Sequence, residues 1–386
     1  MPQDPALPTE PSPEGSSSDQ PPGEPLPPRW PDWPPNWPEI QKSVASVLRD
    51  GQWGHYHAKV TRRLTEQIAE QFGSPHVQLC CSGTAAIELS LRAAGLKAGD
   101  EVILAAFDFP GNLRTIELLG LRPVLVDCQA DSASIDCQEV MRAASVHTRA
   151  VIVSHLYGTM VDLTELRAWA DDQDIILVED ACHCPGATVA GKVAATAGHV
   201  GVLSFGGSKT LTSGNGGAIL TADPRLAQRA QMIAHRPSDA TPLSALQAAA
   251  LLPQLTRLDE QATRRRQAAA QLTQLIDSLA AQGFANLRPA AAGSQPDYYK
   301  FAFLAPSETV RNRVVAAAEA NGFPLRAAYR SSSRVSPRRC RRPETLPHAE
   351  RLGKCLLTID HPVLAADPEQ YQAIETLLRQ LLAAQQ

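Results

Sequence analysis

The stretch SFGGSKTLTSGNGGAI, residues 204–219, places Lys209 in a run of glycine, serine and threonine directly after a short apolar segment. Glycine-rich loops let the backbone come close to a phosphate, and a lysine there can bind phosphate or act as a nucleophile. The spacing departs from the GxxxxGK[ST] loop of nucleotide hydrolases, because Gly207 and Ser208 separate Gly206 from Lys209. The loop also follows the fifth apparent strand rather than the first, so a nucleotide hydrolase is a poor fit.

The segment before this loop is the last of five short apolar runs that are typical of buried strands. They are EVILAAF (101–107), RPVLVD (122–127), AVIVSHL (150–156), IILVED (175–180) and VGVLSF (200–205). Helix-like segments such as LTELRAWADDQ (163–173) lie between them. Apolar strands that alternate with helices predict a mainly parallel sheet covered on both faces. Ligands of such sheets bind at the carboxyl ends of the strands.

The regions on either side of these strands are predominantly helical. Residues 40–72 and the segment SGTAAIELSLRAAG (82–95) have helical patterns. After Thr241 a long Ala/Leu/Gln-rich helical stretch follows, which Pro253 should kink or divide. A predicted strand, YYKFAFLA, and a predicted helix, ETVRNRVVAAAEANG, come next. We therefore expect a large α/β domain over residues 39–255 and a small C-terminal α+β domain over residues 256–386.

The N-terminal segment has a different composition. Residues 1–38 are rich in proline, serine, glycine and glutamate, which predicts a disordered tail. Trp30, Trp33 and Trp37 near its end are candidates to dock on the folded body. A proline-rich ligand for another domain is the alternative reading of this tail.

Bulk composition narrows the classes of function. The chain has 386 residues, 44% of them hydrophobic, and a formal net charge of −4, which favours neither nucleic acid nor a membrane as partner. It shows no apolar run of about 20 residues and no signal peptide, so we expect a cytoplasmic protein. Its eight cysteines fit neither a disulfide scaffold nor zinc spacing, and Cys182 and Cys184 lack a partner motif, so we expect reduced thiols and no metal.

Three motifs at strand ends carry candidate chemistry. Ser82, Gly83 and Thr84 begin a predicted helix, whose free N–H groups can bind an anion, although Ser-Gly-Thr is also a good helix cap. Asp180 ends a predicted strand, where it can reach a ligand or cap a helix. With Lys209, these motifs suit pyridoxal 5′-phosphate (PLP), which needs a lysine amine, an acid at its pyridine nitrogen and a phosphate cradle.

At these residues the chain resembles the DegT/DnrJ/EryC1/StrS family of PLP-dependent aminotransferases. The resemblance runs from about Gly54 to the C-terminus and rests on ordered motifs: SGTAAIEL, GDEVILAAFDF, RPVLVD, SHLYGTMVDL, VEDACHCPGA, LSFGGSKTLTSGNGGAI and LQAAALLPQLTRLDE. It implies the type I PLP-enzyme (aspartate aminotransferase-like) fold and a homodimer with active sites at the shared interface. It also implies transfer of an amino group from glutamate or glutamine to a keto sugar or related ketone, in sugar biosynthesis.

The resemblance also implies roles for seven residues. Lys209 would form a Schiff base with PLP and shuttle the proton between the donor and the cofactor, and Asp180 would keep the pyridine nitrogen protonated. His183 would face the cofactor's 3-hydroxyl. The other four would stack on the ring (Phe109) or bind the phosphate (Gly83, Thr84 and Ser204). Core packing is the alternative for Phe109, and for His155 in HLYG we favour a structural role.

Two departures from the family pattern leave alternatives open. Many members carry Asn-Tyr-Arg-Met before LQAA, with the Asn reaching the phosphate in the neighbouring subunit, whereas this chain has ATPL at residues 240–243. Residues 326–342 hold seven arginines, which can bind a substrate carboxylate or form a solvated basic loop. A PLP-dependent lyase or dehydratase and a non-catalytic PLP-fold binding or sensor protein are the competing functions. The retained Lys209 favours the aminotransferase over the lyase.

Overall fold

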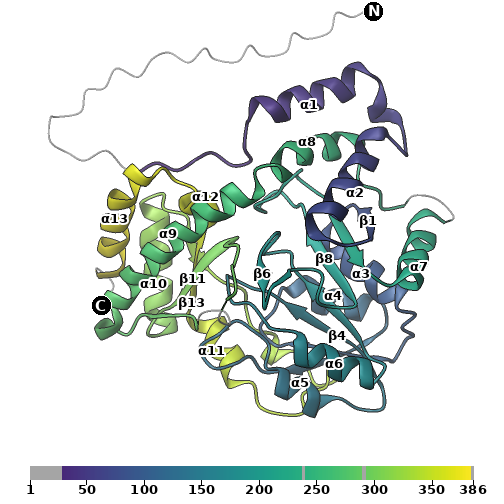
Figure 1. Cartoon of the computed structure of the whole chain (residues 1–386). Coiled ribbons are helices and arrows are strands. Elements are labelled where there is room, and N and C mark those ends of the chain that lie inside the picture. Colours follow the sequence, from purple (N-terminus) through teal and green to yellow (C-terminus); the bar gives the residue numbers. More distant parts are fainter. Residues whose placement is uncertain (1–27, 237–239, 289–292, 384–386) are drawn as a thin grey trace, which may run out of the picture.

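A mixed seven-stranded sheet lies at the centre of the larger of the two parts of the molecule (Figure 1). The structure is a computed structural model that describes residues 28–236, 240–288 and 293–383. The strand order is β1-β9-β8-β5-β4-β2-β3, in which neighbours from β8 to β3 are parallel and β9 runs antiparallel to both β1 and β8. The bounds are His76–Cys80 (β1), Glu101–Ala105 (β2), Arg122–Val126 (β3), Thr148–Ser154 (β4), Ile176–Asp180 (β5), Val200–Ser204 (β8) and Gly217–Thr221 (β9).

The five strands expected from the sequence correspond to β2, β3, β4, β5 and β8, and the mainly parallel sheet is present. The sequence did not indicate β1 and β9. β1 is an edge strand in which His76 and Gln78 interrupt the apolar pattern, and four of its five residues are only partly buried. β9 is fully buried, but it follows the glycine-rich loop so closely that its apolar residues look like the end of that loop.

Helices cover the large sheet and connect its strands. They are α1 (Pro38–Arg49), α2 (Lys59–Phe72), α3 (Gly83–Ala93), α4 (Pro110–Leu118), α5 (Cys137–Ala143), α6 (Thr164–Asp172), α7 (Pro224–His235) and α8 (Ala245–Leu255). The helical stretch expected over residues 40–72 is divided by a short 3₁₀ turn, η1 (Gln52–Gly54). Gly51, before this turn, has φ 68°, a left-handed conformation that ends α1 and suits glycine.

A four-stranded antiparallel sheet forms the smaller part, in the order β10-β11-β13-β12. Its strands are β10 (Ala285–Asn286), β11 (Lys300–Leu304), β12 (Leu325–Ala327) and β13 (Leu356–Asp360), and a two-stranded hairpin, β6 (Thr188–Val189) and β7 (Lys192–Val193), belongs to neither large sheet. The accompanying helices are α9 (Leu258–Ser278), α10 (Glu308–Ala320), α11 (Pro347–Cys355), α12 (His361–Leu364) and α13 (Tyr371–Ala383).

The boundary expected at residue 255 coincides with the end of α8, which contains Pro253 and is followed by α9 from Leu258. Apolar residues of the small sheet, Leu304 and Leu356 among them, belong to the same buried cluster as the large sheet. The two parts therefore share packing, and the division into domains stays a prediction. Across the described ranges, no helix is long and apolar enough to cross a membrane.

The segment before α1 lies against the body of the molecule. Of the predicted disordered tail, residues 1–27 lie outside the described residues; residues 28–37 run from the α12–α13 region towards α1 (Figure 1). The ring of Trp30 packs edge-on against Phe323, with ring centroids 5.7 Å apart. The ring of Trp33 packs edge-on against His361 at 4.4 Å. All three tryptophans have contacts, since the Arg257 guanidinium lies 4.6 Å from the Trp37 ring.

Candidate active site

One cavity of about 260 Å³ lies at the carboxyl ends of β5 and β8 and beside the start of α3. All seven residues that the sequence singled out line it: Lys209, Asp180, His183, Ser204, Gly83, Thr84 and Phe109. They come from segments more than one hundred residues apart in the chain. The sheet therefore brings together the strand-end carboxylate, the loop lysine and the helix start that the sequence shows separately.

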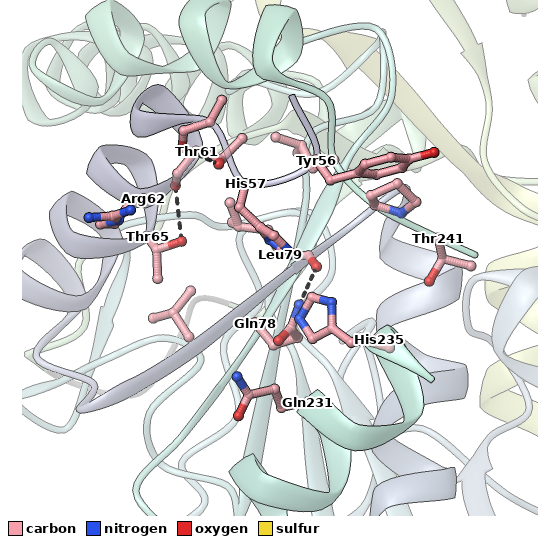
Figure 2. A pocket seen from close by; sticks show the side chains of 15 residues that line it. Tyr56, His57, Thr61, Arg62, Thr65, Gln78, Leu79, Gln231, His235 and Thr241 are labelled. Atoms are coloured by element: carbon pink, nitrogen blue, oxygen red, sulfur yellow. Dashed lines mark hydrogen bonds between the residues drawn. The ribbon is translucent and has the colours of Figure 1, made fainter. Parts of the chain in front are cut away.

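A second cavity, of about 320 Å³, lies between residues 56–65, β1 and α7 (Figure 2). Tyr56, His57, Arg62 and His235 line it, but none of its lining residues is a carboxylate, a serine, a cysteine or a lysine. Residues 241–243, where many family members carry the phosphate-binding Asn motif, line this cavity and not the one with Lys209. We therefore place the reaction chemistry in the cavity that contains Lys209.

The start of α3 forms a cradle with room for an anion. The Ser82 hydroxyl accepts a hydrogen bond from the Ala85 N–H at 3.0 Å, so Ser82 is indeed a helix cap. The first N–H groups of a helix have no partner within it, which makes this end suited to an anion as well. A Cβ at Gly83 would lie 2.8 Å from the Cβ of Ser204, so only glycine lets the helix start approach the end of β8.

Asp180 is the buried acid of the cavity, with 5% of its surface exposed. One carboxylate oxygen accepts the Cys182 N–H at 3.0 Å, and the other accepts the Asn112 amide at 3.0 Å. The residues after Asp180 form turns and not a helix, which excludes the helix-cap interpretation. Asp180 is thus held by its own strand end and by α4, with its oxygens at the cavity.

A second buried carboxylate lies behind Asp180. Asp108 accepts hydrogen bonds from the Phe109 N–H at 2.6 Å and from the Asn112 amide at 3.4 Å. Burial, together with the negative charge of Asp180, raises the pKa of Asp108 to about 7. The Asn112 amide also lies 3.2 Å from the Ser154 hydroxyl, so it bridges the two carboxylates and a strand-end serine. No motif in the sequence singled out Asp108 and Asn112, although both follow a predicted strand.

Lys209 lies beside aromatic side chains that line the cavity. Its Nζ is 4.3 Å from the centroid of the Tyr299 ring, close enough for a cation–π contact. The Lys209 N–H donates to the Gly206 carbonyl at 2.9 Å, which closes the turn that presents the side chain. Tyr299 and Tyr329 line the cavity but come from the distant C-terminal part, where nothing in the local sequence marks them.

His183 is buried among these aromatic rings. Its Nε2 lies 3.2 Å from the Tyr329 hydroxyl, and its ring centroid lies 4.4 Å from that of Tyr299. Burial and the positive charges of Lys209 and Lys300 hold the pKa of His183 well below its usual range, so the ring is neutral. Its Nδ1 is buried and has no hydrogen-bond partner among the described residues. A buried polar atom of this kind indicates a ligand group beside it.

Phe109 is not a core residue. Its exposed fraction is 37%, and its ring centroid lies 5.8 Å from that of Tyr329. The core-packing alternative therefore does not hold, and the ring is free to cover a ligand in the cavity.

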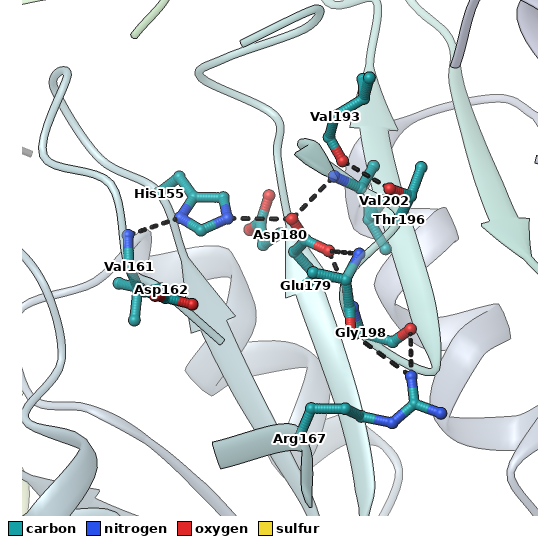
Figure 3. Close-up of polar contacts among 12 residues, drawn as sticks. His155, Val161, Asp162, Arg167, Glu179, Asp180, Val193, Thr196, Gly198 and Val202 are labelled. Carbon is teal, nitrogen blue, oxygen red and sulfur yellow. Dashed lines mark hydrogen bonds and ion pairs between the residues drawn. The ribbon is translucent and has the colours of Figure 1, made fainter. Parts of the chain in front are cut away.

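His155 and Glu179 form a buried polar pair one residue away from Asp180 (Figure 3). The Nε2 of His155 lies 3.0 Å from a Glu179 oxygen, and its Nδ1 accepts the Val161 N–H at 3.2 Å. Glu179 also accepts three backbone N–H groups, from Ala195, Ala197 and Gly198. Burial raises the pKa of Glu179, but these hydrogen bonds outweigh burial and leave the pKa below its ordinary value. The pair holds the turn after β7 in place, as a structural role for His155 requires.

Several arginines of the basic segment hold it against the large sheet. Arg341 binds both Glu101 oxygens, at 2.8 and 2.7 Å, and Arg339 binds both Glu117 oxygens at the same distances. These bidentate pairs make much of residues 326–342 structural. Arg330 is exposed and directly follows the cavity residue Tyr329. It is therefore the arginine of this segment that is closest in sequence to a residue of the cavity.

The chain is similar to a family of aminotransferases over most of its length. The model of the DegT/DnrJ/EryC1/StrS aminotransferase family matches residues 36–377. The L-glutamine:2-deoxy-scyllo-inosose aminotransferase of Micromonospora echinospora is 31% identical over an alignment 404 positions long, covering 92% of this chain and 95% of that protein. The L-glutamine:scyllo-inosose aminotransferase of Streptomyces griseus is 29% identical, with 92% of this chain and 94% of that protein covered.

The solved structures include a similar fold over nearly the whole chain. The crystal structure of 3-amino-5-hydroxybenzoic acid synthase superposes with a TM-score of 0.85 and 26% identity, covering 93% of this chain and all of that chain. This similarity confirms the predicted fold class, a type I PLP-enzyme fold with a large, mainly parallel sheet and a smaller C-terminal sheet.

Proposed function

Because this chain belongs to the DegT/DnrJ/EryC1/StrS aminotransferase family, we propose that it transfers the amino group of glutamine to a cyclic polyhydroxy ketone, with PLP as cofactor. The chain is an aminotransferase, as the sequence predicted. Two similar curated aminotransferases are named for L-glutamine and an inosose acceptor, which supports glutamine over glutamate and a keto cyclitol or keto sugar as substrate. The observation that carries the proposal is the convergence of Lys209, Asp180 and an anion cradle in one cavity.

The residues of the cavity fit PLP. The start of α3 and Ser204 offer N–H and hydroxyl groups to a phosphate, in a cradle that a Cβ at Gly83 would fill. The buried Nδ1 of His183 has no partner among the described residues and is available to a polar ligand group. Asp180 supplies a carboxylate suited to a pyridinium N–H, and Phe109 supplies an exposed aromatic face. We infer that these residues bind the phosphate, the ring substituents, the ring nitrogen and the ring face, respectively.

Bound PLP supplies an electron-withdrawing ring that stabilises the charge left when a proton leaves the amino donor. The protein prepares this step with its own groups. Asp180, which accepts a hydrogen bond from Asn112, would hold a proton at the ring nitrogen. Lys209 Nζ would bind the cofactor covalently and, as a free amine, would accept the proton from Cα of the donor. His183 stays neutral, and Tyr299 and Tyr329 line the cavity beside it.

We also propose that two copies of the chain form a homodimer. Large apolar side chains are exposed on or next to α1, η1 and α7: Leu48, Trp53, Tyr56, Met232 and Ile233, with exposed fractions between 40% and 77%. Exposed apolar side chains gathered in this way are typical of protein interfaces. Light scattering of the purified protein should give about twice the chain mass, and Trp53→Asp should shift it towards the monomer. A monomeric wild-type protein would contradict this assignment.

Isotope transfer tests the proposed reaction. The protein with PLP is incubated with glutamine labelled with ¹⁵N at the α-amino group and with 2-deoxy-scyllo-inosose, scyllo-inosose or a nucleotide-linked keto sugar. We expect mass spectrometry to show labelled nitrogen in an aminated product from one of the cyclic ketones, and none with Lys209→Ala. Label transfer from glutamate but not from glutamine would overturn the donor. No labelled product from any cyclic ketone would overturn the acceptor class.

A further inference from the structure

Two side chains from opposite ends of the chain hold the loop that presents Lys209. The Trp33 indole Nε1–H donates to the Gly207 carbonyl at 2.9 Å. The His361 Nε2 lies 3.0 Å from the carbonyl of Ser208. These are the two consecutive carbonyls directly before Lys209, and the two residues that bind them are 328 positions apart in the sequence.

The two side chains also support each other. The rings of Trp33 and His361 pack edge-on, with centroids 4.4 Å apart and planes at 87°. His361 is 3% exposed and begins α12. Burial, together with the positive charges of Arg265, Lys300 and Lys209, lowers the pKa of His361 to about 3 although the Ser208 hydrogen bond opposes this. The neutral ring must carry its proton on Nε2, because the Ser208 carbonyl can only accept.

The same loop is bound from the cavity side. The Ser208 hydroxyl lies 2.9 Å from the Tyr299 hydroxyl, and Thr210 donates to the buried carboxylate of Asp297 at 3.3 Å. Residues on both sides of Lys209 are thus fixed by the segment before β11. The carbonyls of Gly207 and Ser208 accept their hydrogen bonds from Trp33 and His361 instead.

The sequence of the loop explains why such contacts matter. Gly206 and Gly207 lack side chains that could hold this backbone, and an ideal Cβ at either would find no heavy atom closer than 3.5 Å. Glycine loses more conformational freedom on ordering than any other residue. Hydrogen bonds from outside the loop therefore act together with the internal Lys209 N–H to Gly206 bond in fixing the Lys209 backbone, and with it the position of Nζ over the Tyr299 ring.

We propose that Trp33 and His361 are positioning residues for Lys209, and that the segment before α1 supports the active site through Trp33. This inference rests on the proposed function, in which Lys209 bonds to the cofactor. Neither residue lines the cavity, so both act through the Gly207 and Ser208 carbonyls and not by contact with substrate. An N-terminal segment that looks like an expendable tail in the sequence thereby contributes to catalysis.

Matched variants separate the hydrogen bond from the packing. Trp33→Phe removes the Nε1 donor and keeps a ring against His361, whereas Trp33→Ala removes both. Trp30→Ala is the control, because Trp30 lies in the same segment but contacts Phe323 and not the loop. His361→Gln keeps a donor that can replace Nε2, and His361→Leu removes it. Thermal unfolding of each variant shows that it is folded, and if Trp33→Ala fails to fold, Trp33→Phe decides.

The first readout needs no cofactor. Lysines of the cofactor-free protein are acetylated at a series of pH values, and peptide mass spectrometry follows Lys209, with the exposed Lys192 of β7 as internal reference. We expect the relative rate at Lys209 in Trp33→Phe and His361→Leu to change by about threefold to tenfold, the size associated with one neutral hydrogen bond. Trp30→Ala and His361→Gln should match the wild-type protein.

The second readout is the fraction of PLP that borohydride reduction traps on Lys209 at limiting PLP. It should fall in Trp33→Phe and His361→Leu by a similar factor, while Trp30→Ala keeps the wild-type value. If both readouts are unchanged in Trp33→Phe, Trp33→Ala and His361→Leu, the positioning role is overturned. If wild-type protein traps no PLP, the proposed function fails, and the acetylation rates still decide whether Trp33 and His361 position Lys209.

Discussion

At the scale of single residues, two adjacent carboxylates in β5 have different partners because a strand directs consecutive side chains to opposite faces of the sheet. Glu179 and Asp180 are consecutive in β5, where side chains alternate between the two faces. Glu179 binds the turn at residues 195–198, whereas Asp180 reaches the cavity. The sequence could not show from composition alone which of the two carboxylates faces a ligand.

Replacement of the cavity acid should damage the reaction more than the binding of PLP. In Asp180→Asn the amide no longer stabilises a proton at the ring nitrogen, so we expect the rate of the glutamine half-reaction to fall by about 10²- to 10³-fold. Covalent attachment of PLP should persist. Stopped-flow absorbance measures the rate, and Asp50→Asn, at the exposed end of α1, is the control. A rate within twofold of wild type would remove Asp180 from this role.

Asp108 gives the cofactor-free protein a distinct pH dependence. Its pKa is raised from 3.8 to about 7 on folding, so the folded state holds a proton that the unfolded state has lost between these values. The contribution of Asp108 to stability is therefore present below about pH 4 and is lost as the pH rises towards 7. Asp108→Asn abolishes this loss, so the variant should gain stability relative to wild type from pH 4 to 7 and no further above it.

Urea unfolding at several pH values between 4 and 8 measures this difference. Asp172→Asn, a replacement of an exposed carboxylate at the end of α6, is the control. A constant difference between Asp108→Asn and wild type over the whole range would show that Asp108 has an ordinary pKa in the folded protein.

At the scale of elements, the sequence predicted the parallel strands well because each is a continuous apolar run between helices. The same reasoning missed β1, since an edge strand with His76 and Gln78 has no such run. It also predicted the start of α3, because helix N-termini are marked by local residues such as Ser82. The sequence did not show which side chains from other elements contact the candidate site residues, such as Asn112 at Asp180 and Tyr299 at Lys209.

The contact between α3 and β8 offers a test of the cradle. In Gly83→Ala the added methyl group would lie 2.8 Å from the Ser204 Cβ and 3.1 Å from the Cys182 sulfur, so the helix start must move away. We expect PLP to bind at least about tenfold more weakly, the loss expected from one charge-assisted hydrogen bond. Absorbance titration measures the affinity, and Gly54→Ala, with nothing within 4 Å, is the control. Equal affinity in the two variants would argue against a phosphate site at α3.

At the scale of the whole molecule, the fold joins segments that the sequence keeps far apart. The cavity takes residues from α3, from the ends of β5 and β8, and from positions 299 and 329 of the C-terminal part. A mainly parallel sheet with a cleft at the carboxyl ends of its strands follows from general rules for such sheets, which is why the sheet could be predicted. The approach of the small sheet and of the N-terminal segment depends on tertiary packing, which leaves no local pattern.

Truncation distinguishes the parts of the N-terminal segment. Removal of residues 1–30 takes away Trp30 and its contact with Phe323 but keeps Trp33, so activity should stay within about twofold of the full chain, less than the loss of one hydrogen bond would change it. Removal of residues 1–35 also deletes Trp33 and should lower the rate of the glutamine half-reaction by about threefold to tenfold. Steady-state kinetics of both proteins provides the comparison. Equal loss in both truncations would show that Trp33 has no special part.

The central claim is that Lys209 bonds PLP in the cavity and that glutamine supplies the amino group. The most direct measurement is the visible absorption spectrum of the purified protein with PLP, before and after glutamine, beside Lys209→Ala and the control Lys192→Ala. We expect a visible band that requires Lys209 but not Lys192 and that glutamine converts to the spectrum of pyridoxamine phosphate. An unchanged band in Lys209→Ala, or a wild-type band that glutamine leaves unaltered, would contradict it.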